Sequence, residues 1–270
     1  MAMALLSVEE LSVTYEHHGH TTRVVDQVSF SIEVGEWFAL VGESGSGKST
    51  TALALTGLLP SSAHAAASAI RFEGRDLHHM PERELRAVRG RRIAYVFQDP
   101  ATSLNPVLTI GEQICEVLSL HAGRRGADAE AAAAEWLRRV GIAEPRLAAY
   151  PHEFSGGMQQ RVMLAMAMAA EPALLIADEP TSALDVTVQV QLLRLLRGLQ
   201  RQFGLAVLLI THDLLIVERL AQRMAVMERG RLVEQGRVPE VFQRPQHPAT
   251  RRLLDARARL SFRRRGASND

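Results

Sequence analysis

The chain has 270 residues, of which 47% are hydrophobic and 23% charged, as in a globular protein that buries a core. This length suits one large domain or two closely packed subdomains. Basic and acidic residues number 31 and 30, and the resulting net charge of +1 argues against a general nucleic-acid binder held by charge alone. Thirty of the 31 basic residues are arginine, and the one lysine is Lys48.

Cysteine content and hydropathy exclude several other classes. The chain has one cysteine, Cys115, so it has no disulfide framework, thiolate zinc site or cysteine-ligated iron–sulfur cluster of its own. Its N-terminus lacks the basic flank and long apolar stretch of a signal peptide, and no apolar run approaches the ~20 residues that cross a bilayer. We therefore expect a protein that is cytosolic or lies on a membrane from the cytosolic side.

The hydrophobic pattern predicts β-structure first, then strands alternating with helices, then a helical tail. The expected strands are residues 6–8, 11–15, 28–32, 37–41, 93–97, 173–177 and 206–210, with a strand pair around the turn at 229–230. The expected helices are residues 49–58, 109–121, 127–140, 156–170 and 186–203, followed by helix from residue 239 onward. Strands that alternate with helices indicate an α/β fold with a parallel sheet.

Residues 99–170 read almost entirely as helix, although they lie between two strands of the expected sheet. An ordinary crossover connection is much shorter than these ~70 residues. The segment is therefore interpreted as an inserted helical subdomain.

A glycine-rich segment that follows the strand expected at 37–41 matches the P-loop pattern G-x-x-x-x-G-K-[ST] at every fixed position. Glycines allow successive backbone N–H groups to point at phosphate oxygens, and the positive end of the next helix faces the same anion. Lys48 supplies a compact charge to the β- and γ-phosphates, and the Ser49 hydroxyl can ligate Mg²⁺. A chance match is disfavoured because a strand precedes the loop and a helix follows it. The predicted nucleotide-binding residues here are Gly42, Glu43, Ser44, Gly45, Ser46, Gly47, Lys48, Ser49 and Thr50.

Two adjacent carboxylates, Asp178 and Glu179, end the buried strand expected at 173–177. By itself such a pair is more often the start of a solvated loop. Together with a P-loop, it predicts a hydrolytic site in which Asp178 holds Mg²⁺ through water and Glu179 orients the attacking water.

A third segment, Phe154-Ser155-Gly156-Gly157-Met158, opens a helix with a small polar residue and two glycines, which makes a second anion site. With this segment placed between the P-loop and Asp178, the chain resembles an ATP-binding cassette (ABC) ATPase over nearly its whole length. The segment is similar to the signature sequence of that family. The resemblance implies that two cassettes pair head to tail. In that pair, Ser155, Gly156, Gly157 and Met158 of one cassette contact the ATP bound by the other.

The resemblance also implies the fold and its division. We expect a P-loop NTPase (RecA-like) α/β core with an N-terminal antiparallel β-subdomain and an inserted α-helical subdomain. The ATP-binding core with its β-subdomain would comprise residues 1–98 and 171–235. The helical signature subdomain would comprise 99–170, and the C-terminal tail 236–270.

Other family positions are matched one by one. Gln98 resembles the glutamine that senses magnesium and the membrane partner, and His212 resembles the switch histidine that contacts the γ-phosphate. Tyr15 matches the aromatic residue that stacks on adenine, although a plain strand aromatic is the alternative. The expected catalytic residues are Lys48, Gln98, Glu179 and His212, the Mg²⁺ ligands Ser49, Gln98 and Asp178, and the residues for communication across the dimer Ser182 and Asp185.

Several short sequence segments indicate which subgroup of the family the chain resembles. The signature begins with Phe154 where leucine is commonest and has Met158 where glutamine is commonest, but the Ser-Gly-Gly backbone site remains. Residues 98–106 resemble the glutamine-loop region of oligopeptide, dipeptide and nickel importers, and residues 244–248 resemble the same group's tail. Without the cysteines of an iron–sulfur tail, the chain resembles the short first-type ATPase subunits of that group.

Two polar features have competing interpretations. His17, His18 and His20 on one turn could ligate nickel or zinc, but a solvated loop is favoured because nothing completes a coordination shell. The basic residues 263–265 could lie against anionic lipid headgroups, but a disordered tail is favoured.

The predicted function is ATP hydrolysis, with ATP and Mg²⁺, that powers an importer of peptides or of nickel or metal-chelate ligands. The expected partners are a second ABC ATPase subunit (a different chain or a second copy), two transmembrane permease subunits and, indirectly, an extracytoplasmic substrate-binding protein, with no nucleic acid. The protein would then lie peripherally on the cytoplasmic face of the inner membrane. A soluble ABC ATPase acting on DNA or ribosomes and an export cassette are the alternatives, and the transported ligand stays open.

Overall fold

A computed structural model describes residues 4–17, 19–182 and 184–266 of the chain. It divides into two compact units, of which the first comprises Met1–Met80 and Leu208–Asp270 and the second Pro81–Val207. Strand β9 (Ala206–Thr211) carries the chain from the second unit back into the first. Each unit has its own strands, helices and buried residues.

An antiparallel sheet forms the N-terminal part of the first unit. Its long strands β1 (Leu6–His17) and β2 (His20–Ile32) pair from end to end. Strands β4 (Ala63–Ala66) and β5 (Ala69–Phe72) pair with the other edge of β1, and β6 (Arg75–Asp76) follows β5. The sheet corresponds to the predicted β-subdomain.

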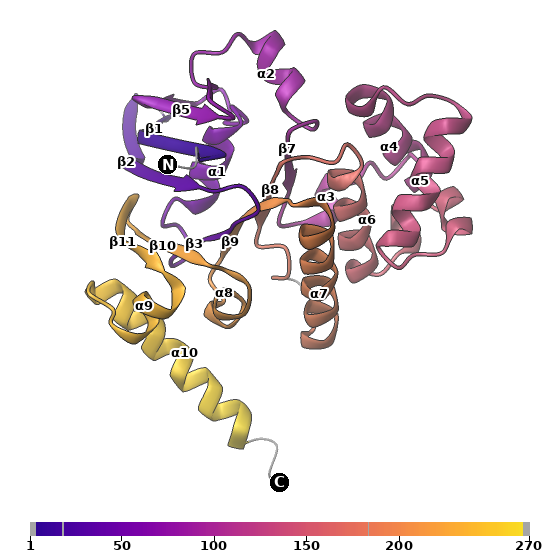
Figure 1. Cartoon of the computed structure of the whole chain (residues 1–270). Coiled ribbons are helices and arrows are strands. Elements are labelled where there is room, and N and C mark those ends of the chain that lie inside the picture. Colours follow the sequence, from indigo (N-terminus) through magenta and orange to yellow (C-terminus); the bar gives the residue numbers. More distant parts are fainter. Residues whose placement is uncertain (1–3, 18, 183, 267–270) are drawn as a thin grey trace. The chain divides into compact units, whose positions relative to one another are not determined.

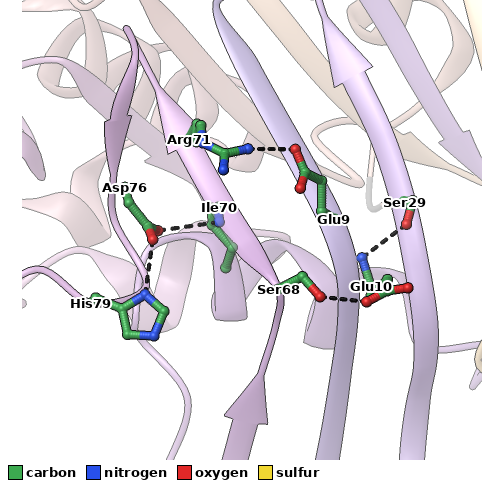
Figure 2. A network of polar contacts seen from close by, with 8 residues as sticks. All are labelled: Glu9, Glu10, Ser29, Ser68, Ile70, Arg71, Asp76 and His79. Carbon is green, nitrogen blue, oxygen red and sulfur yellow. Dashed lines mark hydrogen bonds and ion pairs between the residues drawn. The ribbon is translucent and has the colours of Figure 1, made fainter.

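Exposed polar side chains connect three strands of this sheet, as Figure 2 shows. Arg71 of β5 forms an ion pair with Glu9 of β1, and the Ser68 hydroxyl donates to the Glu10 carboxylate. The Glu10 amide donates to Ser29 Oγ of β2 at 2.8 Å, where the register of β1 and β2 shifts and Glu10 has a φ of 54°. Because Arg71 and Glu9 are exposed, their ion pair contributes only about 0–1 kcal/mol to stability.

The first unit also contains strands that position the P-loop. Strand β3 (Trp37–Val41) runs parallel to β10 (Arg223–Glu228), which pairs antiparallel with β11 (Arg231–Arg237). The helices of this unit are α1 (Lys48–Leu55), α8 (Leu214–Leu220), α9 (Val238–Gln243) and α10 (Pro248–Gly266). Helices α8 and α9 pack on β3 and β10 through buried Val217, Val226 and Val241. Figure 1 shows α9 and α10 following β11 near the C-terminal end.

The second unit contains two parallel strands, β7 (Ile93–Val96) and β8 (Leu174–Asp178), with most of its helices between them in sequence. Helices α4, α5 and α6 pack against one another (Figure 1). The α-helices are α2 (Glu82–Val88), α3 (Pro100–Ser103), α4 (Ile110–Val117), α5 (Ala127–Arg139), α6 (Gly156–Met168) and α7 (Val186–Phe203). The shorter turns are the π-helix η1 (Leu118–Ala122) and the 3-10 helices η2 (Glu144–Ala148) and η3 (Pro151–Glu153).

The structure confirms the predicted α/β fold, and a few of its elements differ from the prediction. The helix expected over 49–58 ends at Leu55, because Gly57 takes a φ of 61° and Pro60 follows. The helix expected over 109–121 changes to π-helical hydrogen bonding after Val117. Strands β4 to β6 and helices α2, α3 and α8 are not among the predicted elements. The predicted division at residues 98, 170 and 235 stays a prediction.

Candidate nucleotide-binding site

The P-loop follows β3 and depends on glycine at two positions. A Cβ on Gly42 would lie 2.2 Å from the Met227 carbonyl oxygen, so no larger residue fits there. Gly47 has a φ of 102°, and a Cβ on it would lie 2.8 Å from the Val24 carbonyl oxygen. The Ser46 amide donates to the Glu43 carbonyl at 3.2 Å and closes the turn. The backbone therefore curls around a small space at the start of α1.

Lys48 is buried in this loop, with 5% of its surface exposed. Its Nζ donates to the Gly42 carbonyl at 3.0 Å and to the Glu43 carbonyl at 2.9 Å. These two bonds help to hold the ammonium over the loop. The position suits a group that must meet phosphate oxygens.

Ser46 supplies an observation that points to a ligand. Its hydroxyl is buried, and within the described residues its Oγ has no hydrogen-bond partner. A buried hydroxyl without a partner costs free energy, so a site of this kind usually gains its partner from a ligand or water. A phosphate oxygen in the loop would satisfy it. Ser49 and Thr50 follow in the first turn of α1, with Ser49 exposed and Thr50 half-buried.

The other predicted residues of the first unit lie at strand ends. Tyr15 is half-buried on β1, where it is the register partner of Thr22 on β2 and of Ala63 on β4. His212 is exposed and directly follows β9. The next residue, Asp213, caps α8 by accepting a hydrogen bond from the Leu215 amide at 2.8 Å. His212 is thus fixed between a strand end and a capped helix.

In the second unit, Asp178 is the last residue of β8 and is 6% exposed. The Tyr95 hydroxyl of β7 donates to its Oδ2 at 2.9 Å. Burial and then the negative charge of Asp178 raise the pKa of Tyr95 well above its usual range, so this hydroxyl stays protonated and acts as a donor. Sequence reasoning missed Tyr95, because a tyrosine in an apolar strand reads as packing.

Glu179 follows with a φ of 45°, the left-handed region that a residue with a side chain seldom adopts. Such a conformation costs about 1–3 kcal/mol and persists where the surroundings enforce it, often at functional sites. The Glu179 carbonyl accepts from the Ser182 amide at 3.2 Å, and Gln98 Nε2 lies 3.5 Å from Ser182 Oγ. The unit thus brings the predicted Gln98, Glu179 and Ser182 together. Ala183, between Ser182 and Leu184, lies outside the described residues.

The predicted signature segment begins α6. Ser155 caps this helix, its Oγ accepting from the Met158 amide at 3.4 Å. A Cβ on Gly157 would lie 2.4 Å from Val188 Cγ1 of α7, so glycine allows the two helices to approach closely. Asp185 caps α7 by accepting from the Thr187 and Val188 amides, both at 3.0 Å. The start of the signature helix and Asp185 are therefore neighbours.

Phe154, the unusual first residue of this segment, is buried. It contacts Arg146, a second residue that sequence reasoning missed. The Arg146 guanidinium lies 4.3 Å from the Phe154 ring centroid and donates to the Glu153 carbonyl at 2.7 Å. Gln159 Nε2 donates to the Pro151 carbonyl at 2.8 Å. These contacts fix the loop that leads into Ser155. No spacing in the sequence would have indicated Arg146, because it lies on a separate short helix.

The predicted histidine turn lies between β1 and β2. His17 and His20 are register partners at the β1–β2 turn, whereas His18 lies outside the described residues. Within the described ranges, no three histidine, cysteine or acidic side chains are grouped so that they could hold a metal ion. Nor does that part of the chain contain a helix both long and apolar enough to span a bilayer.

Comparison with known proteins agrees with this arrangement. The family model described as ABC transporter matches residues 25–182. The peptidoglycan transport ATP-binding protein YejF of Agrobacterium fabrum is 56% identical over 93% of this chain and 47% of its own length. The dipeptide transport ATP-binding protein DppD of Escherichia coli is 47% identical over 94% of this chain and 78% of its own length. The chain thus spans about half the length of YejF.

Among solved structures, the ATP-binding cassette MJ0796, described as a dimer in a post-hydrolysis state bound to ADP and Pi, has a TM-score of 0.76. It is 26% identical, and the match covers 86% of this chain and 98% of that one. The matched fold, the P-loop and the long matches to transport ATP-binding proteins lead to one conclusion: this chain is an ATP-binding cassette and belongs to the ABC transporter family.

Proposed function

We propose that the chain hydrolyses ATP to power an importer of peptides. The observation that carries this proposal is the preformed P-loop, with Lys48 bonded to its carbonyls and the buried Ser46 hydroxyl left for a ligand. Relatives named for dipeptide and oligopeptide transport support the cargo class. The chain would act as a dimer of cassettes, with the same chain or a different one. It would lie on the cytoplasmic face of the membrane against two permease subunits.

The chemistry would consist mainly of positioning and charge neutralisation. The backbone N–H groups of the P-loop and Lys48 would bind the β- and γ-phosphates. Glu179 would orient the attacking water and accept its proton, and His212 would contact the γ-phosphate. Tyr15 would stack on adenine. Ser155, Gly156 and Gly157 would contact the ATP of the partner cassette, and Ser182 and Asp185 would lie near that interface.

Mg²⁺ fits the residues proposed to hold it. Ser49, Gln98 and Asp178 offer a hydroxyl, an amide oxygen and a carboxylate, the oxygen donors that this ion prefers. When bound, Mg²⁺ would neutralise charge on the β- and γ-phosphate oxygens. The buried Asp178 carboxylate already has a hydrogen-bonded orientation, which supports this assignment.

The other cargoes and classes differ in support. Nickel and metal-chelate import remain a narrower candidate that rests on the string at residues 98–106. A DNA or ribosome clamp and an export cassette find no support among the relatives, which are named for transport of peptides and peptidoglycan.

Reconstitution into proteoliposomes tests the proposal. The chain would be combined with two permease subunits and a substrate-binding protein of a peptide importer from the same organism, and phosphate release would be measured with dipeptides, longer peptides or nickel salts. Peptide-stimulated ATP hydrolysis is the expected result. Stimulation by nickel alone, or co-purification of the chain with nucleic acid rather than with membrane subunits, would contradict it.

A further inference from the structure

Tyr95 connects the end of β8 to the wall of a cavity in the second unit. Its hydroxyl donates to Asp178 Oδ2 at 2.9 Å. Its ring stacks on Phe97, with centroids 4.3 Å apart and planes inclined by 29°. Both aromatic rings line a cavity of about 450 Å³, whose lining also includes residues of α3, α4, η1 and α6.

The strand register explains how this contact arises. In the parallel pair of β7 and β8, Tyr95 is the partner of Ile176. The long tyrosine side chain reaches along the strand direction to Asp178, two residues further on. A phenylalanine here would keep the stacking on Phe97 but could not reach the carboxylate with a donor.

The hydrogen bond from Tyr95 can set the orientation of the Asp178 carboxylate because Asp178 is buried. A carboxylate that is 6% exposed has little water to orient it, so its neighbours set the rotation of the group. One of its oxygens accepts the hydrogen bond from Tyr95, whose own ring is stacked on Phe97. Hydrogen bonds to a metal-binding carboxylate commonly fix its geometry in this way.

We propose that Tyr95 is a positioning residue that holds the Asp178 carboxylate in the orientation used by Mg²⁺. The inference rests on the proposed function, since it requires Asp178 to take part in metal binding. Tyr95 would act on the metal only through Asp178, while its ring lines the cavity. Loss of such a hydrogen-bonded partner typically weakens metal affinity or activity by about 10–100-fold.

The test compares Tyr95→Phe with the wild-type chain and with Tyr150→Phe, which makes the same chemical change at an exposed tyrosine. Binding of Mn²⁺, as a spectroscopic substitute for Mg²⁺, is measured by electron paramagnetic resonance with ATP present. Binding of ATP without metal is measured in a chelating buffer. We expect Tyr95→Phe to bind Mn²⁺ about tenfold more weakly, at unchanged metal-free ATP affinity, and Tyr150→Phe to match the wild type.

Equal Mn²⁺ affinity of Tyr95→Phe and wild type would overturn the inference. If Tyr95→Phe does not fold, as judged by thermal unfolding, Tyr95→Met removes the hydroxyl with a flexible side chain, and the same weakening is expected. Failure of the proposed function looks different, because the wild-type chain itself would then neither bind Mn²⁺ with ATP nor hydrolyse ATP. If the wild type is active and Tyr95→Phe binds Mn²⁺ with equal affinity, the positioning role of Tyr95 is contradicted and the proposed function is not.

Discussion

Lys48 is the one lysine in a chain with thirty arginines, and its ammonium sits where a larger cation would not fit. Its Nζ lies 3.0 Å from the Gly42 carbonyl oxygen and 2.9 Å from that of Glu43, inside a loop that tolerates no Cβ at Gly42. A guanidinium is planar and wider, and its fork cannot occupy the volume of an ammonium. Replacing Lys48 by arginine would therefore keep the charge of the side chain but change its shape.

We predict that Lys48→Arg loses most ATP hydrolysis, by about tenfold or more, because the side chain would displace the loop or the phosphates. Phosphate release by the purified chain measures this, with Arg201→Lys on the exposed face of α7 as the control for exchange of the two cations. A Lys48→Arg chain with wild-type turnover would show that the lone lysine reflects composition only.

Among the elements, α4 begins with a capping box. Thr109 Oγ1 accepts from the Glu112 amide at 3.2 Å, and the Glu112 carboxylate accepts from the Thr109 amide at 2.7 Å. Hydrogen bonds from the Thr109 amide and hydroxyl lower the pKa of Glu112. A lowered folded-state pKa means that the stabilisation is present above the unfolded pKa and is lost as the pH falls through the folded one.

We therefore predict that Glu112→Gln destabilises the chain most above about pH 5, and that the difference from wild type shrinks as the pH falls below about 4. Urea unfolding at several pH values measures this, and Glu116→Gln on the same helix is the matched control. Thr109→Ala should lower the free energy of unfolding by about 1 kcal/mol at neutral pH. A Glu112→Gln difference that grows on acidification would contradict the role of the carboxylate.

The loop before α6 depends on Arg146, whose guanidinium stacks on Phe154 and bonds to the Glu153 carbonyl. We predict that Arg146→Ala lowers the free energy of unfolding by about 1–2 kcal/mol, and that Arg146→Lys restores only part of it because an ammonium cannot stack as a plane. Denaturant unfolding measures both variants. Full restoration by lysine would mean that charge alone matters here.

Sequence pattern predicted the elements that are long, apolar or marked by glycine. The P-loop after β3, Asp178 at the end of β8 and the capped starts of α6 and α7 all lie where strand and helix signals place them. Strand β4 was missed because its alanines have weak strand preference, and its pairing with β1 decides its conformation. Contacts between separate elements, such as that of Tyr95 with Asp178, depend on register and side-chain reach and leave no local signal.

At the scale of the whole molecule, the chain belongs to the ABC transporter family, and the next property to measure is its catalytic cycle. The proposed base is Glu179, which is held in a left-handed conformation directly after β8. Replacing it should separate binding from hydrolysis, because the residues proposed to bind the phosphates, the P-loop and Lys48, do not include it. A dimer closed on unhydrolysed ATP should then accumulate.

The most direct measurement is phosphate release from Mg²⁺ and ATP by the wild-type chain and by Glu179→Gln, with mass determined by light scattering in the same samples. We predict hydrolysis by the wild type and a loss of about 10²–10⁴-fold in Glu179→Gln, together with ATP binding and a stable dimer. Wild-type turnover in Glu179→Gln would contradict the assignment of the base, and an inactive wild type would contradict the proposed function itself.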